Sequence, residues 1–328
     1  MANFFSKKNG FSIYALSALL LLMGACSSNS DSASSPITTG PSTIAYVANE
    51  GNSTVSFCSI SASDGTLSSC VDSGNTGIAF DTPVGIALNS AATFAYVPNV
   101  SGSSVSICPI NANHTFGACV DSGNSITSAI GITLNAANTF AYVSSGTVGA
   151  VSQCPVHPNG TWGTCVDSGA GAVFNGAEGV VINPAGTFAY IVSNAGNSVS
   201  FCAINPATGV FSACTDSGNT GLAFMNPEFM TINAAGTIAY VANHGNNEVY
   251  ACPININGSF GACVDSGNTG TAFDAPKDVR IDSSGAFAYV SNNNNNTLEV
   301  CPINPDGSFG ACAATGSGFN GPWGIALK

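Results

Sequence analysis

A short run of the sequence, APKDVRID, carries four charged side chains within six residues: Lys277, Asp278, Arg280 and Asp282. Charged residues make up only 7% of the chain, so such a cluster is unusual within it. Carboxylates serve as general acids, general bases or ligands, and Lys and Arg side chains bind anions. The cluster is therefore the first candidate for a functional site.

The same slot recurs in five other parts of the chain. The residue aligned with Lys277 is apolar, acidic or aromatic elsewhere, and the residue aligned with Asp278 is usually Gly. The first position holds Val84, Ile130, Glu178, Glu228, Lys277 and Trp323, and the second holds Gly85, Gly131, Gly179, Phe229, Asp278 and Gly324.

The three His residues add one candidate. His114 and His157 fall in predicted hairpin loops of different repeats, and we interpret both as turn residues. His244 falls in the loop HGNN, on the face where repeat proteins of this kind usually bind, and joins the ligand-binding candidates. The sequence has no His-Glu-x-x-His, no Gly-x-Ser-x-Gly and no Gly-rich phosphate loop with a Lys. Motifs therefore name no catalytic residue and no cofactor.

The tripeptide Asp-Ser-Gly recurs in five repeats and invites a metal interpretation. Repetition at this frequency is better explained by an Asp side chain that caps its own turn. We predict no metal site. The five motifs begin at Asp72, Asp121, Asp167, Asp216 and Asp265.

An internal repeat of 46 to 50 residues must position these side chains. Ala-Tyr followed by Val or Ile marks each unit, and a period of this length is typical of propellers and solenoids. One unit contains four short apolar or β-branched runs bounded by turn residues, at 84–88, 93–98, 104–110 and 115–120, here called strands A to D. The marker Tyr residues are Tyr46, Tyr96, Tyr142, Tyr190, Tyr240 and Tyr289.

Six units of four antiparallel strands predict an all-β fold, a six-bladed β-propeller with minimal helix. The folded region begins at strand B, TIAYVAN, and ends after an isolated strand A, GPWGIAL. We expect this C-terminal strand A to complete a blade with the N-terminal strands B, C and D. The ring would then close without a covalent bond.

Strand A is expected to be the innermost strand, so its first residues should ring the top mouth of the central channel. Glu178, Glu228, Lys277 and Trp323 would converge there, with Asp278 and Arg280 beside them and Asp282 farther down. Two interpretations remain open: the side chains bind a ligand, or Lys277 and Arg280 only neutralise Glu228, Asp278 and Asp282. Charges at an otherwise apolar interior position are costly unless paired, and both interpretations satisfy this requirement.

Twelve of the 13 Cys residues form six pairs spaced 11 or 12 apart, one pair per repeat. An even count in an exported chain argues for disulfides. The predicted hairpin turns offset the two Cys by one residue, and a bulge near the Gly before the second Cys would correct this. The predicted bonds are Cys58–Cys70, Cys108–Cys119, Cys154–Cys165, Cys202–Cys214, Cys252–Cys263 and Cys301–Cys312.

Residues 1–25 have the form of a signal peptide, with two Lys residues before an apolar stretch too short for a comfortable membrane span. The stretch ends LMGAC and resembles a bacterial lipoprotein signal, which implies acylation of Cys26. Ser27 resembles the outer-membrane sorting pattern. Residues 26–42 are Ser-rich and are expected to act as a flexible tether, followed by the propeller at 43–328.

The segments AYVANEGNSTVSFC, AYVPNVSGSSVSIC and AYVANHGNNEVYAC resemble the YVTN-type β-propeller repeat. The INPxxG and PxGIALN segments resemble the rest of that repeat, which also occurs in lactonase-like propellers. The likeness covers nearly the whole chain after the tether. Three features depart from the pattern: the unit is longer, each blade has two Cys, and lactonase-like relatives commonly have seven blades.

These observations predict an exported lipoprotein of the cell envelope, anchored in the outer membrane, whose propeller binds a partner through its top face. The partner would be an envelope or extracellular protein or a small ligand. The resemblance also allows a lactonase-like hydrolase, in which Glu178 and Glu228 act as base or metal ligand while Lys277 and Arg280 hold an anion. A purely structural envelope component is the third alternative. After the leader, three basic residues face 17 acidic ones, which disfavours nucleic acid as a partner.

Overall fold

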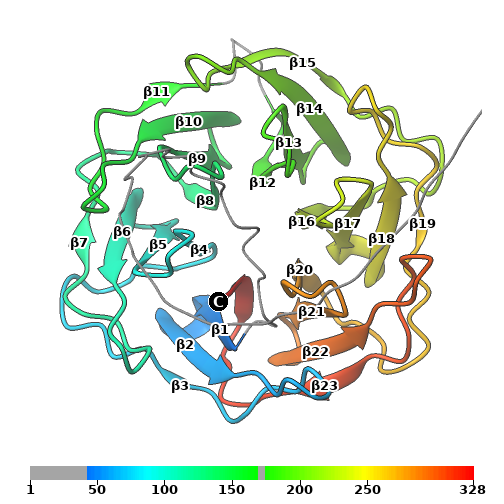
Figure 1. Ribbon diagram of the computed structural model, residues 1–328, viewed down its shortest axis with the longest axis horizontal. Helices are drawn as coiled ribbons and strands as arrows, with labels where there is room; N and C mark the ends of the chain where they lie inside the picture. Colours follow the sequence, from blue (N-terminus) through cyan, green and yellow to red (C-terminus); the bar gives the residue numbers. More distant parts are fainter. Residues whose placement is uncertain (1–42, 169–173) are drawn as a thin grey trace, which may run out of the picture. The chain divides into compact units, whose positions relative to one another are not determined.

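The computed structural model describes residues 43–168 and 174–328. Six four-stranded antiparallel sheets are arranged around a central axis (Figure 1), which confirms the predicted six-bladed propeller. Blades 1 to 5 are β4–β7, β8–β11, β12–β15, β16–β19 and β20–β23, and blade 6 is β24 with β1–β3.

In every blade the strands run outward from the axis in the order A, B, C, D (Figure 1). Strands A are β4 (Ala87–Leu88), β8 (Ala129–Leu134), β12 (Ala177–Ile182), β16 (Pro227–Ile232), β20 (Pro276–Ile281) and β24 (Pro322–Leu327). Strands B are β1 (Ile44–Asn49), β5 (Phe94–Asn99), β9 (Phe140–Ser145), β13 (Phe188–Ser193), β17 (Ile238–Asn243) and β21 (Phe287–Asn292). Strands C are β2 (Thr54–Ser59), β6 (Ser104–Pro109), β10 (Ala150–Pro155), β14 (Ser198–Ile204), β18 (Glu248–Pro253) and β22 (Thr297–Pro302). Strands D are β3 (Val71–Asp72), β7 (Val120–Asp121), β11 (Val166–Asp167), β15 (Phe211–Asp216), β19 (Val264–Asp265) and β23 (Ala313–Thr315).

The two ends of each blade differ in their connections. The D–A and B–C loops lie at one end, here called the top face, and the A–B turns and C–D hairpins lie at the other, the bottom face. Helix content among the described residues is limited to two 3-10 turns in B–C loops, η1 (Glu50–Asn52) and η2 (His244–Asn246). His114 and His157 lie in C–D hairpins of blades 1 and 2, at the bottom face as predicted.

The C-terminal strand closes the ring as expected. β24 pairs antiparallel with β1, with Tyr46 opposite Ala326 and Val47 opposite Ile325. Strand A of blade 6 therefore comes from the end of the chain and strands B to D from its beginning (Figure 1).

The marker Tyr residues join neighbouring blades. Each Tyr is fully buried, and five of the six hydroxyls donate to a carbonyl oxygen in the C–D hairpin of the next blade. Four of these rings also stack on a Phe ring in the next blade that lies at the start of strand D or a few residues before it, for example Tyr142 on Phe211 at 5.0 Å between centroids. The Tyr motif thus has a structural role, because it connects neighbouring blades. The acceptor carbonyls belong to His114, Gly209, Gly258, Gly307 and Gly65.

All six predicted disulfides form, each between strand C and the residue before or within strand D of one blade. In blade 1, Ile110 lies opposite Phe116 near the hairpin, whereas Ile107 lies opposite Val120. The pairing register therefore shifts by one residue between these points, and the predicted correction is confirmed. Strand D is shorter than the predicted run 115–120, because the shift interrupts the ladder and leaves only a bridge at Phe116.

Four of the five Asp-Ser-Gly motifs lie wholly within the described residues and form turns in which the Asp accepts a hydrogen bond from the Gly two residues later. Asp72 Oδ1 accepts from Gly74 N at 2.6 Å, and Asp216 Oδ1 accepts from Gly218 N at 2.8 Å. In four blades, the Asn after the motif makes a hydrogen bond to the next blade. For example, Asn219 Oδ1 accepts from the Cys263 amide. In these four motifs the Asp caps its own turn, as predicted, and the Asn after the motif connects neighbouring blades.

The expected leader, the acylated Cys26 and the Ser-rich tether lie outside the described residues. Within 43–168 and 174–328, no helix is long and apolar enough to cross a membrane. Six disulfides are typical of proteins that fold outside the reducing cytoplasm.

Candidate functional site

A register shift at the start of the A strands sets the direction of the candidate side chains. In blade 5, Pro276 lies opposite Asn292 but Asp278 lies opposite Ser291, so Lys277 is the extra residue of a β-bulge. The same shift occurs in β8, β12, β16 and β24. As a result, Lys277 contacts blade 4 while the adjacent Asp278 contacts blade 6.

Lys277 and Glu228 form a buried ion pair between blades 5 and 4. The Lys277 Nζ lies 2.8 Å from Glu228 Oε1, and the two side chains are 8% and 4% exposed. His244, on η2 at the rim, places its Nδ1 3.2 Å from the same Glu228 oxygen and 3.4 Å from Lys277 Nζ. The Lys277 Nζ also lies 4.2 Å from the centroid of the Trp323 ring, a cation–π distance. Four of the predicted candidates are therefore brought together.

Glu178 occupies the same ring position in blade 3 and is not paired. Its Oε2 atom is buried, with no hydrogen-bond partner in the described part of the chain. Burial and, to a smaller extent, the negative charge of Glu228 raise the pKa of Glu178 to about 8, against the opposing effect of the Lys277 charge. Glu178 is therefore mostly protonated at neutral pH, beside an ion pair of zero net charge.

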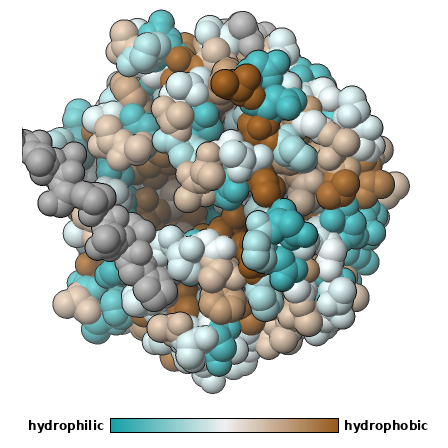
Figure 2. All heavy atoms as spheres, turned by 45° about the vertical axis from the view of Figure 1, so that its right-hand side comes forward, coloured by the Kyte–Doolittle hydropathy of each residue, from teal (hydrophilic) through white to brown (hydrophobic). Residues whose placement is uncertain are grey.

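The remaining part of the mouth is apolar. Val84, Ile130 and Phe229 form a buried cluster, against which Trp323 packs. In the space-filling view, hydrophobic atoms are visible in the hollow near the middle of the ring (Figure 2). At the first ring position, the mouth thus has a charged arc in blades 3 to 5 and an apolar arc in blades 6, 1 and 2, while Phe229 of blade 4 extends the apolar cluster at the second position.

The Gly residues at the second ring position are required by close strand packing. A Cβ atom on Gly131 would lie 2.2 Å from the Glu178 carbonyl oxygen, and one on Gly85 would lie 2.3 Å from that of Ile130. In blades 4 and 5 this position holds Phe229 and Asp278 instead. The ring is therefore asymmetric at the second position as well as at the first.

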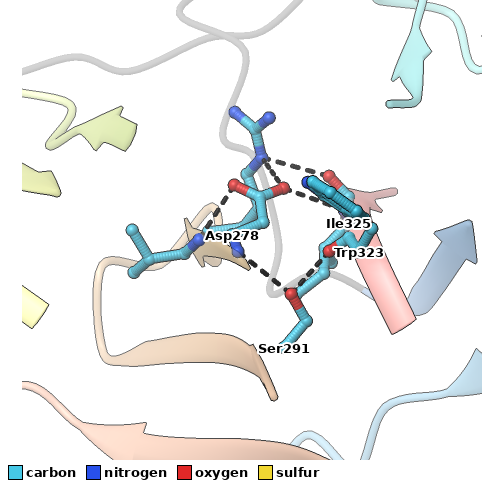
Figure 3. A network of polar contacts seen from close by, with 6 residues as sticks. Asp278, Ser291, Trp323 and Ile325 are labelled. Carbon is cyan, nitrogen blue, oxygen red and sulfur yellow. Dashed lines mark hydrogen bonds and ion pairs between the residues drawn. The ribbon is translucent and has the colours of Figure 1, made fainter. Parts of the chain in front are cut away.

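Asp278 and Arg280 form a second ion pair, separate from the first and directed toward blade 6. Asp278 Oδ2 accepts hydrogen bonds from Arg280 Nε at 3.0 Å and from the Ile325 amide at 2.9 Å. The Asp278 amide donates to Ser291 Oγ, which donates to the Trp323 carbonyl (Figure 3). Asp278 is fully buried, and burial raises its pKa while Arg280 opposes the shift. This network joins β20 to β24 and has a structural role.

Within the described ranges, Asp282 pairs with neither Lys277 nor Arg280, contrary to the neutralisation interpretation. Its Oδ1 accepts hydrogen bonds from the Ala286 and Phe287 amides, and its Oδ2 accepts from the Ser284 hydroxyl. It caps the A–B turn at the bottom face, where four other blades have Asn in the same role. The pairing of Lys277 and Arg280 is thus limited to Glu228 and Asp278.

Sequence reasoning missed Glu299, a fully buried carboxyl on β22. Asn292 donates to its Oε1 at 3.3 Å, while Oε2 has no partner among the described residues. Burial raises the pKa of Glu299 to about 7. Alignment of the repeats could have revealed this residue. The position two residues before the strand C Cys holds Ser56 in blade 6 and Ser106 in blade 1, whereas blade 5 has Glu299.

The donor set does not form a metal centre. Within the described ranges, no three His, Cys, Asp or Glu side chains are arranged to hold a metal ion. The arrangement instead offers a protonated carboxyl, a neutralised ion pair and an indole. Such groups can bind hydroxyl groups and the apolar faces of a ring.

Part of the chain matches a known family. Residues 175–311 match the model of the family described as "Lactonase, 7-bladed beta-propeller". This segment contains the charged arc of the mouth but covers less than half of the chain. No curated protein matches the chain.

Solved structures resemble the whole propeller. A protein from Lactobacillus plantarum is 13% identical with a TM-score of 0.62, over 88% of this chain and 99% of that one. The periplasmic gluconolactonase of Pseudomonas aeruginosa is 15% identical with a TM-score of 0.57, over 83% and 79%. A chain of a nidogen–laminin complex is 13% identical with a TM-score of 0.61, over 87% and 98%. At these identities the likeness establishes the fold alone.

Proposed function

We propose that this protein is an exported binding protein whose channel mouth holds a small, uncharged, hydroxyl-bearing ligand such as a sugar or sugar lactone. The observation that carries the proposal is Glu178, a carboxyl with a buried oxygen that lacks a partner in the described structure. Buried polar atoms are almost always hydrogen-bonded, so an orphan carboxyl oxygen at this ring position favours an absent partner. A ligand hydroxyl supplies one.

The charge of the mouth favours a neutral ligand. Glu228 and Lys277 cancel each other, and the raised pKa of Glu178 keeps that side chain mostly neutral below pH 8. The Lys277 ammonium is already engaged by Glu228, His244 and the Trp323 ring. A free anion would therefore find no unpaired cation among these residues, whereas a polyol can use both the polar and the apolar arc.

Calorimetry with methyl glycosides and aldonolactones tests this proposal. The wild type should bind at least one neutral compound, and E178M, which has no side-chain oxygen, should bind it about tenfold more weakly through loss of a hydrogen bond. The matched control is E248M, which changes a partly buried Glu on β18 outside the ring positions. Equal affinity of E178M and wild type, or no binding to any compound, contradicts the proposal.

Hydrolysis of a lactone at the same mouth is the second candidate. The family match at 175–311 includes Glu178, Glu228 and Lys277, and a carboxyl with a pKa near 8 suits proton transfer close to neutral pH. In this alternative Glu178 would move the proton and Glu228 would hold Lys277 in place. Turnover of a lactone panel by wild type but not by E178Q supports it, and binding without turnover leaves the binding function.

We further propose that the protein is held to the outer membrane by acyl chains on Cys26. The LMGAC motif and the Ser residues after it support this location, as do the six disulfides. Labelling with a palmitate analogue should mark the wild type and not C26S. Equal labelling of both forms would exclude acylation at this residue.

A further inference from the structure

The bottom face carries a row of grooves, each between the A–B turn of one blade and the C–D hairpin of the next. The groove between blades 4 and 5 is much the largest of those measured, with a volume of 650 Å³. The grooves between blades 2 and 3, 1 and 2, and 5 and 6 measure 340, 260 and 200 Å³. Only the largest is well within the usual range for a small-molecule pocket.

Two positions distinguish this groove. The first residue of strand B is Phe in blades 1, 2, 3 and 5 and Ile in blades 4 and 6, at Ile238 and Ile44. The Phe rings lie against the hairpin Gly of the next blade, as Phe287 does at Gly65, where a Cβ atom would be 2.7 Å from the ring. Ile238 faces Gly307 in the same way but is smaller. In blade 6 the equivalent hairpin residue of the next blade is His114 instead of Gly. Blade 4 thus combines a smaller strand B residue with a hairpin Gly, which leaves a more open groove.

The groove has an apolar lining. Its wall includes four Ile side chains from three neighbouring segments, together with Pro305 and the buried Tyr240. The Tyr240 hydroxyl is occupied by the Gly307 carbonyl, so its ring presents a carbon surface. The four residues are Ile232, Ile238, Ile281 and Ile303.

The rim of the groove is acidic. Asp282 lines it, and Asp306 lies in the hairpin that forms its outer wall. Hydrogen bonds from Ser308 lower the pKa of Asp306, so this carboxyl is ionised at neutral pH. No Lys, Arg or His is found among the described residues that line the groove. The Asp282 charge is not needed for the turn, because Asn233 caps the equivalent turn in blade 4.

We propose that the groove between blades 4 and 5 binds a small apolar cation, an organic amine that carries a ring or a branched hydrocarbon. The hydrocarbon occupies the space that Phe fills in other blades, and the ammonium group lies toward Asp282 and Asp306. This site is at the opposite end of the propeller from the channel mouth. It does not depend on the function proposed there.

Benzylammonium, benzyl alcohol and phenylacetate provide matched probes that differ in charge. In the full-length protein with ¹³C-labelled Ile methyl groups, benzylammonium should shift the four Ile signals of the groove, with a dissociation constant of roughly 1–10 mM. Benzyl alcohol should bind more weakly and phenylacetate most weakly. Equal affinities for the three, or no saturable shift of these signals, would overturn the proposal.

Two variants locate the site and its charge. I238F installs the residue of four other blades, so the fold should tolerate it, and binding should be lost. The control I256F makes the same change at a fully exposed hairpin residue and should leave binding intact. D282N should weaken benzylammonium about two- to fivefold and leave benzyl alcohol unchanged. Undiminished benzylammonium binding by I238F would show that the groove is not the site.

Discussion

Removal of the Lys277 charge is the sharpest test of the channel-mouth geometry. K277M keeps most of the side-chain length but leaves Glu228, which is 4% exposed, without its counter-ion at 2.8 Å. Loss of one partner of a buried pair typically costs about 3–5 kcal/mol, because the remaining charge stays buried. The Trp323 ring also loses the cation that lies 4.2 Å from its centroid.

The expected loss can be measured by thermal unfolding. In a domain of this size, 3–5 kcal/mol corresponds to a fall in Tm of roughly 6–15 °C. The double variant E228Q/K277M should recover most of the loss, because neither charge is then left alone.

Two outcomes would refute this reasoning. One is a K277M variant whose Tm stays within about 2 °C of wild type, which would mean that Glu228 is solvated or held by another group. The other is a double variant as unstable as the sum of the two single variants, since independent losses would mean that the side chains do not interact.

Three further predictions concern the scaffold. The pKa of Glu299 rises from 4.5 to about 7 on folding. The protonated side chain therefore stabilises the fold fully below pH 4.5, and this contribution is lost as the pH rises through 7. In denaturant titrations over this range, the wild type should lose up to about 3 kcal/mol of unfolding free energy relative to E299Q. Y289F should cost about 1 kcal/mol of unfolding free energy, because the Tyr289 hydroxyl donates to a hairpin of the next blade. Y96F should be neutral in the same assay, since no partner for the Tyr96 hydroxyl is present in the described structure. Equal losses would contradict a stabilising role of the hydrogen bond between blades. Replacement of both Cys58 and Cys70 by Ser should cost about 3 kcal/mol at most, and an unchanged unfolding midpoint under non-reducing conditions would show that this bond contributes nothing.

Much of the scaffold was predictable because its signals repeat. The Tyr spacing gave the blade number, the isolated strand A at the C-terminus gave the closure, and the Cys spacing gave the six bonds. Alignment of the repeats also brought Glu178, Glu228, Lys277 and Trp323 to one layer, since equivalent residues of a propeller lie on one ring. These inferences needed only one-dimensional patterns.

The contacts between blades could not be predicted in the same way. Lys277 and Asp278 are adjacent, yet the bulge directs them toward opposite neighbours. Asp282 was grouped with them by sequence distance but caps a turn at the other end of the strand. Glu299 was overlooked because it lies in an apolar strand, where only comparison with the Ser of other repeats shows that it is exceptional. Side-chain direction, rather than position in the repeat, decides these cases.

The fluorescence of Trp323 offers the most direct test of ligand binding at the channel mouth. The chain has two Trp residues, and Trp162 stacks on Tyr96 near the bottom face, where four other blades have Phe. W162F should therefore fold normally and leave Trp323, which packs beside Lys277, as the single reporter. Titration with the neutral glycosides and lactones should change its emission in a saturable way, and E178M should weaken the response. A saturable binding isotherm by calorimetry with no change in Trp323 emission would place the ligand elsewhere and contradict the proposed site.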